Sequence, residues 1–368
     1  MNYVKFVFSL ITLQVIFLIT ACSNSSLIKE NQIVKIDADD PNIQYVGRFN
    51  FSDPKKIKFD WPGVIISAKF TGSSCSVRLE DGKNEYAVII DNNAPKILST
   101  DTSKIYKVIS GLNDLVPHTI ILQKRTEALV GSGIFCGFIL DPGCTLVNPN
   151  ARPGRRIEFI GNSITCGYGD EGENSDCHFT PQTENANLSY ASITARELNA
   201  DYHLIAYSGK GVVRNYGDPN KTSLDPLPSI FDRICVYDST PKWNFKNWIP
   251  QAVVINLGTN DFSTKPYPDK DVFQKAYLEL INRVRNLYKE VRIFTIVGPM
   301  IGEPCTSYVR EIVLNEQKLK REKDLFFIEI KRTDLASEDW GCDTHPNIFG
   351  MQKMADILVP KIKLRMNW

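Results

Sequence analysis

The pattern of hydrophobic positions divides the chain near residue 155. Ahead of that point, short apolar or alternating runs are separated by turn residues such as Asp81-Gly82, and no run has the period of an amphipathic helix. Short strands at this spacing predict an all-β sandwich over residues 41–148. The runs that predict strands are 63–70, 75–80, 86–90, 105–109, 118–122 and 133–140.

Beyond residue 155, short apolar runs alternate with helical stretches. Runs that are apolar throughout are typical of parallel strands buried on both faces. The alternation predicts a three-layer α/β/α domain with a parallel sheet over residues 155–368, after a linker near residues 145–155 that contains prolines and a glycine. Strands are predicted at 157–160, 203–207, 252–257, 293–297 and 326–330, and helices at 189–199, 271–288, 308–323 and 348–365.

Polar residues whose side chains could take part in a reaction follow two of these strands. The block Gly161-Asn162-Ser163-Ile164-Thr165 places a hydroxyl after the first strand, and Gly258-Thr259-Asn260-Asp261 places an amide after the third. Open α/β sheets carry their sites at the carboxyl ends of strands. Ser163 could be a nucleophile or could simply cap the next helix, and Asn260 could be an oxyanion donor or a turn residue. Asp261 is expected to cap or brace its turn.

A late block, Asp343-Thr344-His345-Pro346-Asn347, offers a base for such a nucleophile. His345 is the best candidate, because His118 and His203 lie in predicted strands. His178 is the one rival, since it lies in the loop after Ser163. The Asp343 carboxylate would hold the imidazole of His345 in the correct tautomer. Its alternative role is structural, as a cap or as one partner of a surface salt bridge.

The ordered blocks resemble the SGNH (GDSL) hydrolase superfamily. That superfamily has Ser in Gly-Asp-Ser, a glycine block, Asn in Gly-x-Asn-Asp, and a late Asp/His pair. The two-residue step from Asp343 to His345, the run Gly161–Gly169 and the β-rich region ahead of it are similar to carbohydrate esterase family 2, the acetylxylan esterases. Asn162 stands where the superfamily has Asp, and little loss of function is expected because Asn162 is not one of the reacting groups.

The resemblance implies a jelly-roll-like sandwich followed by an SGNH domain, and it assigns roles to single residues. Ser163 is the expected nucleophile, His345 the base, which the family places shortly before its last helix, and Asp343 its orienting partner. Some members of the family use a backbone carbonyl in place of the Asp, so the third member stays open. Trp340 is a possible sugar platform or a core residue, and Tyr168 a possible border of the acyl pocket.

The same resemblance implies an oxyanion hole. Gly209, in the block Tyr207-Ser208-Gly209-Lys210-Gly211, aligns best as a backbone N–H donor, with Gly211 as the alternative. The side-chain amide of Asn260 and the backbone N–H of Ser163 would complete the hole.

The expected activity is that of a carbohydrate O-acetyl esterase, which removes acetyl groups from plant-type polysaccharide or oligosaccharide through an acetyl-enzyme. No metal or organic cofactor is expected. Two alternatives remain open: a GDSL lipase or thioesterase that acts on longer acyl esters, and a surface lipoprotein that binds glycan without catalysis. The sequence leaves open whether the β-sandwich itself binds glycan.

The first residues have the pattern of a targeting segment. Residues 1–22 combine Lys5 with an apolar run and end in Leu18-Ile19-Thr20-Ala21-Cys22, which resembles a bacterial lipobox. This resemblance implies a signal peptide over residues 1–21, lipidation of Cys22, a tether over residues 22–40, and an exported, membrane-anchored protein of the outer membrane or cell surface. An ordinary secretory signal is the alternative.

Charge and cysteine content add two constraints. The 43 Lys and Arg residues nearly balance the 42 Asp and Glu residues, so nucleic acid is not an expected partner. Apart from Cys22, eight of the nine cysteines remain, and an exported chain can oxidise them. Cys166–Cys177 and Cys305–Cys342 are two possible pairings, and free buried thiols are the alternative.

Overall fold

The computed structural model describes residues 32–320 and 323–368. The predicted signal peptide, the lipidation site Cys22 and residues 22–31 of the predicted tether lie outside the described residues. Ile33–Trp368 forms one unit. Across the described residues, no helix combines the length and the apolar character needed to cross a bilayer.

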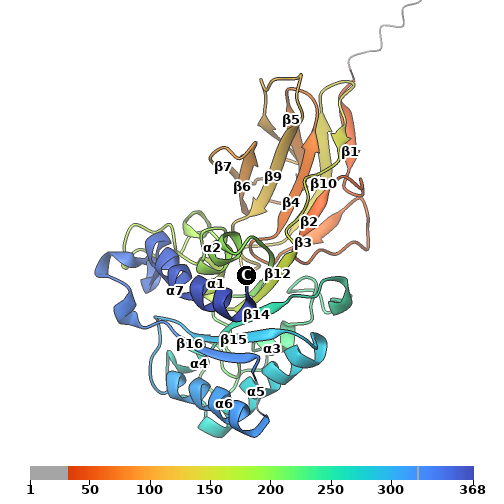
Figure 1. Ribbon diagram of the computed structural model, residues 1–368. Helices are drawn as coiled ribbons and strands as arrows, with labels where there is room; N and C mark the ends of the chain where they lie inside the picture. Colours follow the sequence, from red (N-terminus) through yellow and green to blue (C-terminus); the bar gives the residue numbers. More distant parts are fainter. Residues whose placement is uncertain (1–31, 321–322) are drawn as a thin grey trace, which may run out of the picture. The chain divides into compact units, whose positions relative to one another are not determined.

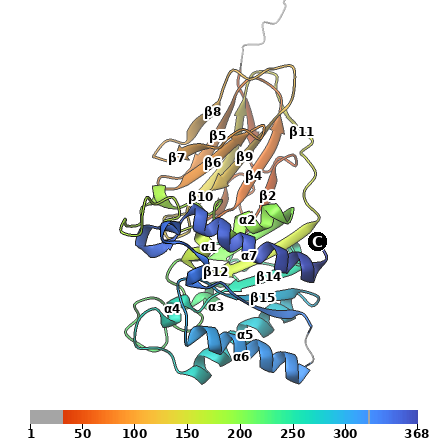
Figure 2. The same ribbon diagram turned by 60° about the vertical axis from the view of Figure 1, so that its left-hand side comes forward.

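The first part of this unit, here called the β region, consists of two antiparallel sheets, as predicted (Figures 1 and 2). One sheet has the order β1-β10-β5-β8 with β3 beside β10, and the other has the order β11-β4-β9-β6-β7 with β2 beside β4. The strands are β1 (Val34–Asp37), β2 (Gln44–Val46), β3 (Ile57–Phe59), β4 (Ile65–Phe70), β5 (Cys75–Glu80), β6 (Glu85–Ile90), β7 (Lys96–Ser99), β8 (Ile105–Ile109), β9 (His118–Lys124), β10 (Gly133–Leu140) and β11 (Leu146–Val147).

Alternating side chains explain why these strands pack face to face. Every second residue of β4 and of β5 is buried, because successive side chains of a strand point to opposite faces. The buried residues of β4 are Ile66, Ala68 and Phe70, and those of β5 are Cys75, Val77 and Leu79. The two sheets therefore enclose an apolar layer, which is the arrangement that the alternating runs predict.

The structure corrects two predicted boundaries. β1 (Val34–Asp37) pairs with β10, so the end of the predicted tether belongs to a sheet. β11 (Leu146–Val147) pairs with β4 inside the predicted linker. Both strands are short, and their pairing partners lie far away in the sequence, which is why local periodicity did not reveal them.

The second part, here called the α/β region, is built on a parallel sheet with the order β13-β12-β14-β15-β16. Figures 1 and 2 show α2 and α7 on one face of this sheet and α5 and α6 on the other. The strands of this sheet are β12 (Arg155–Gly161), β13 (Ala200–Ala206), β14 (Ala252–Asn256), β15 (Arg292–Val297) and β16 (Leu325–Glu329). A separate antiparallel pair consists of β17 (Trp340–Gly341) and β18 (His345–Pro346). The helices are α1 (Ser163–Cys166), α2 (Tyr190–Glu197), α3 (Leu227–Ile230), α4 (Thr259–Phe262), α5 (Lys270–Leu287), α6 (Cys305–Lys320) and α7 (Ile348–Met366).

A buried ion pair joins the β region to the α/β region. Arg48 of the β region lies 3.1 Å from Glu158 of β12, and both side chains are fully buried. The guanidinium also lies 5.3–5.4 Å from the ring centroids of Phe231, Trp243 and Phe245. A buried charge is tolerated only when it is paired and hydrogen-bonded. Removal of either residue would therefore leave the other as an unpaired buried charge.

We expect Arg48→Ala to lower the free energy of unfolding by about 3–5 kcal/mol, because Glu158 is left as an unpaired buried charge. Urea denaturation measures this loss. The matched control is Arg78→Ala, which breaks a partly exposed pair with Asp37 and should cost about 1 kcal/mol or less. Equal, small losses in the two variants would contradict the role given to the buried pair.

Candidate active site

Three strand ends of the parallel sheet bring three predicted site residues together. β12 lies between β13 and β14, and Ile160 of β12 is level with Ile205 of β13 and Ile255 of β14. The carboxyl ends of these strands therefore meet at one edge. Ser163, Gly209 and Asn260 follow the three strands at this edge, which is where an open α/β sheet carries its site.

Ser163 is the first residue of the short helix α1 and is 7 % exposed. The helix is capped by Asn162, whose side-chain oxygen accepts a hydrogen bond from the Ile164 N–H at 3.2 Å. Capping is therefore the role of Asn162, and the alternative of Ser163 as a helix cap is wrong. In residues 32–320 and 323–368, the backbone N–H of Ser163 donates to no other group.

The Ser163 hydroxyl meets the imidazole of His345. The Ser163 Oγ lies 2.8 Å from His345 Nε2, and His345 Nδ1 lies 3.2 Å from the backbone oxygen of Asp343. A carbonyl oxygen can only accept, so Nδ1 carries the proton and Nε2 is free to accept the serine proton. Burial lowers the pKa of His345 to about 4, which keeps the imidazole neutral and its Nε2 free to accept a proton at neutral pH.

The carboxylate of Asp343 does not contact His345, which corrects the expected side-chain role of this residue. It accepts hydrogen bonds from the Tyr168 hydroxyl at 2.9 Å and the Phe179 N–H at 3.0 Å, and it lies 2.8 Å from His178 Nδ1. Burial acts to raise the pKa of Asp343, but these three hydrogen bonds outweigh it and lower the pKa. The backbone carbonyl of Asp343, rather than its carboxylate, orients the imidazole of His345. The sequence therefore indicated the correct residue but not which of its groups contacts the imidazole.

A strained loop carries the histidine. Asp343 and Thr344 have φ angles of 52° and 59°, which non-glycine residues rarely adopt. The loop that follows α1 holds this backbone in place: the Asp343 N–H donates to the Cys177 carbonyl at 2.8 Å, and Cys177 forms a disulfide with Cys342. The imidazole is thus fixed to the segment that follows Ser163.

This disulfide overturns both suggested pairings. Cys166–Cys177 and Cys305–Cys342 do not form, and Cys166 and Cys305 are buried free thiols. The bonded residues are 165 positions apart in the sequence. Only the folding of two distant loops against each other brings them together, which is why spacing could not identify the pair.

The expected oxyanion donors lie around one turn. Gly209 has a φ of 77°, and in the described residues its N–H donates to no other group. The N–H of the alternative, Gly211, is used by Asn215 Oδ1 at 3.2 Å. The Asn260 amide donates to the Lys210 carbonyl at 2.8 Å, so one of its two N–H bonds fixes the side chain beside Gly209 and the other remains for a ligand.

Asp261 braces a neighbouring loop rather than its own turn. Its buried carboxylate accepts hydrogen bonds from the backbone N–H groups of Val212, Val213 and Arg214 at 2.8–3.0 Å. The block that carries Asn260 therefore also fixes the loop after Gly209. The sequence predicted a bracing role for Asp261 but could not identify these partners.

Tyr168 and Trp340 have different surroundings. The centroid of the Tyr168 ring lies 4.4 Å from the ring centroids of His345 and of Phe179, which places it beside the candidate base. Trp340 is 7 % exposed and belongs to the core, with the Arg332 guanidinium 4.2 Å from its ring centroid. This burial favours core packing, the alternative left open for Trp340, over a sugar platform.

Comparison with known proteins agrees with this geometry. Residues 45–149 match the carbohydrate esterase 2 N-terminal model, and residues 159–353 match the GDSL-like lipase/acylhydrolase family model. A family two carbohydrate esterase from Clostridium thermocellum, solved in complex with cellohexaose, is 39 % identical with a TM-score of 0.82; the match covers 89 % of this chain and 99 % of that one. The chain belongs to carbohydrate esterase family 2, within the GDSL-like hydrolases.

Two curated relatives of this carbohydrate esterase family 2 chain extend the comparison. The cellulase/esterase CelE of Acetivibrio thermocellus is 42 % identical over 340 residues, which are 90 % of this chain but 40 % of CelE. An acetylxylan esterase/glucomannan deacetylase of Cellvibrio japonicus is 35 % identical over 221 residues, 58 % of each chain. The chain thus spans less than half of the length of CelE.

The low pKa of His345 predicts an unusual pH profile. Because the imidazole must be neutral to accept the serine proton, kcat/KM should fall only as the pH drops through the pKa of about 4, and activity should persist at about pH 5. A series of kcat/KM measurements with an aryl acetate at different pH values locates this acidic fall, with tryptophan fluorescence as the control for folding. An acidic limb near pH 6.5 would show that His345 titrates as an ordinary histidine.

The geometry of Asp343 predicts a mild phenotype for Asp343→Asn. The backbone carbonyl that orients His345 is retained, so we expect kcat to fall by about tenfold or less through loosening of the loop. A carboxylate that orients the base is worth on the order of 10⁴ in kcat. Steady-state kinetics therefore separates the two cases, and a loss near that larger value would restore the side-chain role.

Proposed function

We propose that the chain is a carbohydrate O-acetyl esterase that acts through an acetyl-enzyme on Ser163. The observation that carries this proposal is the 2.8 Å contact between Ser163 Oγ and a neutral His345 Nε2, in a chain of carbohydrate esterase family 2. A serine hydroxyl becomes a useful nucleophile when a base takes its proton.

The proposed reaction proceeds in two matched halves. Ser163 Oγ bonds to the acetyl carbonyl carbon while His345 Nε2 takes the hydroxyl proton, and the developing oxyanion accepts hydrogen bonds from the N–H groups of Ser163 and Gly209 and from the Asn260 amide. The bond to the sugar oxygen then breaks, and that oxygen takes the proton from His345. Water repeats the sequence on the acetyl-enzyme and releases acetate.

The proposed substrate is an acetylated plant-type polysaccharide or oligosaccharide. The names of the relatives support this class, since one is an acetylxylan esterase/glucomannan deacetylase and a similar structure holds cellohexaose. An exposed ring beside the oxyanion turn also supports it: Tyr216 is 64 % exposed, and its N–H donates to the Gly209 carbonyl at 2.8 Å. Aromatic faces suit the apolar faces of sugar rings.

We also propose a lipid anchor, an exported location and a jelly-roll topology for the β region. Lipidation at Cys22 and export to the outer membrane or cell surface rest on the lipobox-like Leu18–Cys22 sequence, and the Cys177–Cys342 disulfide suits an oxidising compartment. The description of the β region as a jelly roll rests on its two packed antiparallel sheets and its match to the esterase N-terminal model. The near-zero net charge argues against nucleic acid as a partner.

We expect Ser163→Ala to lose acetate release from acetylated xylan and from an aryl acetate by on the order of 10⁶-fold, because the nucleophile is absent. The matched control is Ser229→Ala, which changes an exposed serine and should leave the rate unchanged. Full activity in Ser163→Ala would refute the proposed mechanism.

A lipase or thioesterase is the second candidate, favoured by the match of residues 159–353 to a lipase/acylhydrolase model. Rates on aryl acetate and aryl octanoate separate the two, and faster turnover of octanoate would favour the lipase. A third candidate, a glycan-binding protein without catalysis, is disfavoured by the intact contact between Ser163 and His345.

A further inference from the structure

A carboxylate from the β region reaches the oxyanion turn. Glu127 follows β9 and is fully buried. One of its oxygens accepts a hydrogen bond from the backbone N–H of Ser208 at 2.8 Å, and the other accepts from the Ser208 hydroxyl. Ser208 directly precedes Gly209, so Glu127 holds the residue that presents the proposed oxyanion donor.

Apart from Ser208, one contact restrains Gly209: its carbonyl accepts a hydrogen bond from the Tyr216 N–H at 2.8 Å. A Cβ atom built on it would find only Tyr216, at 3.9 Å, so the space beside its Cα is open. Glycine is also the residue with the greatest backbone freedom. With both the N–H and the hydroxyl of Ser208 held by Glu127, the residue that precedes the Gly209 N–H is fixed on one side, and the Tyr216 contact fixes Gly209 on the other.

The same carboxylate also lies behind the nucleophile. Cys166 ends the single-turn helix that Ser163 begins, and its sulfur lies within 4.8 Å of carboxylate oxygens of Glu127 and Glu184. Glu127 is therefore placed between the two elements that must be aligned for acyl transfer, the nucleophile turn and the oxyanion turn.

Buried groups on both sides fix Glu127 itself. Its backbone N–H donates to Glu184 at 3.0 Å, and the buried ammonium of Lys124 donates to the carbonyls of Thr126 and Glu127 at 2.6 and 3.1 Å. Burial and the neighbouring charge of Glu127 raise the pKa of Glu184 well above its usual range. Burial raises the pKa of Glu127 as well, while the positive charge of the nearby Lys124 acts to lower the pKa of both carboxyls.

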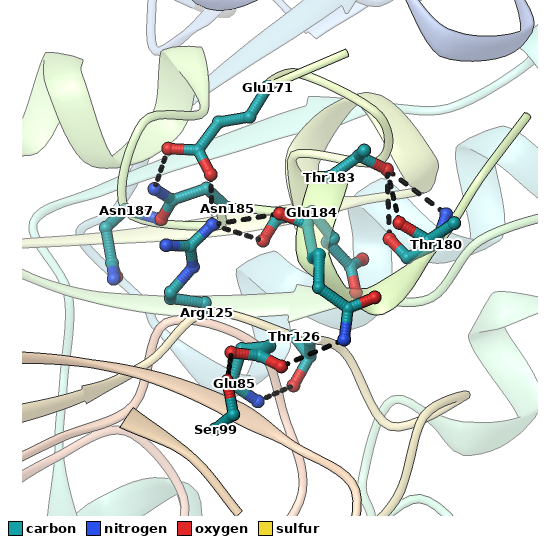
Figure 3. Close-up of polar contacts among 11 residues, drawn as sticks. Glu85, Ser99, Arg125, Thr126, Glu171, Thr180, Thr183, Glu184, Asn185 and Asn187 are labelled. Atoms are coloured by element: carbon teal, nitrogen blue, oxygen red, sulfur yellow. Dashed lines mark hydrogen bonds and ion pairs between the residues drawn. The ribbon is translucent and has the colours of Figure 1, made fainter. Parts of the chain in front are cut away.

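The neighbouring residue Arg125 ties the same segment to the loop after α1 (Figure 3). Its guanidinium pairs with Glu171 and donates to the carbonyls of Gln182 and Glu184 at 3.2 and 3.5 Å. This loop includes Cys177, the disulfide partner of the histidine loop. Residues 125–127 therefore contact the supports of the nucleophile, the base and the oxyanion donor.

We propose that Glu127 is a positioning residue for the reaction: from the β region it holds Ser208, and through Ser208 it sets the direction of the Gly209 N–H toward the oxyanion. This inference rests on the proposed acyl-transfer role of Ser163 and Gly209. It makes the β region part of the active site's support rather than an appended module.

The test compares three substitutions at one position in the full chain. Glu127→Ala removes both contacts to Ser208, and Glu127→Asp keeps the charge but withdraws the carboxylate. Both should lower kcat on an aryl acetate by about ten- to a hundredfold with little change in KM, a part of the effect of deleting an oxyanion donor. Glu127→Gln can still accept from the N–H of Ser208 and donate to its hydroxyl, so it should stay within about fivefold of the wild type.

A second readout reports on the oxyanion hole directly. An aryl trifluoromethyl ketone adds to Ser163 and places an oxyanion in the hole, so its inhibition constant should rise in proportion to the loss of kcat/KM across the three variants. A mere loss of stability would lower the fraction of folded enzyme without changing this constant. Thermal unfolding of each variant gives that fraction.

The matched control is Asp60→Asn. Asp60 is another buried carboxylate of the β region, and it accepts hydrogen bonds from the backbone N–H of Val236 in the α/β region at 2.8 and 3.1 Å, but it has no contact with Ser208. It should keep the wild-type kcat and inhibition constant. An equal fall in Asp60→Asn, or wild-type kinetics in folded Glu127→Asp, would overturn the proposal. An active Ser163→Ala enzyme would instead overturn the catalytic assignment on which the proposal rests.

Discussion

The parallel pairing of β12 with β13 on one side and β14 on the other is the constraint on which the site depends. Because parallel strands end at the same edge, a hydroxyl, a glycine N–H and an amide from three distant parts of the sequence lie together. His345 comes from a separate segment, the loop before α7. Its position is fixed by backbone contacts and a disulfide to the segment that follows Ser163.

The sequence predicted the elements whose side-chain pattern is strong. The continuous apolar run of β14 and the stripe of buried residues on α5, Phe273 to Val284, gave the parallel sheet and its covering helices. β1 and β11 were not predicted, because short strands at a sheet edge carry no clear period. Ser163 and His345 could be singled out as candidates because their blocks follow a strand or precede the last helix in a known order.

The remaining features depend on tertiary geometry. The two-residue step from Asp343 to His345 allows either the carboxylate or the carbonyl of Asp343 to face the imidazole, and the left-handed backbone at Asp343 selects the carbonyl. Trp340 resembles a platform in sequence but lies in the core. Arg48, Asp60 and Glu127 appear as ordinary surface charges of a β-rich segment, yet all three are buried against the α/β region. No local pattern reports such burial.

The central claim is that Ser163, activated by neutral His345, carries the acyl group during turnover. Rapid quenching of the enzyme with an aryl acetate in acid, followed by peptide mass spectrometry, tests it directly. We expect one acetyl group on the peptide that contains Ser163, with fragment ions that place it on the serine oxygen. Turnover with no acetylated enzyme at any quench time, or an acetyl group on another residue that forms and decays at the turnover rate, would contradict the account.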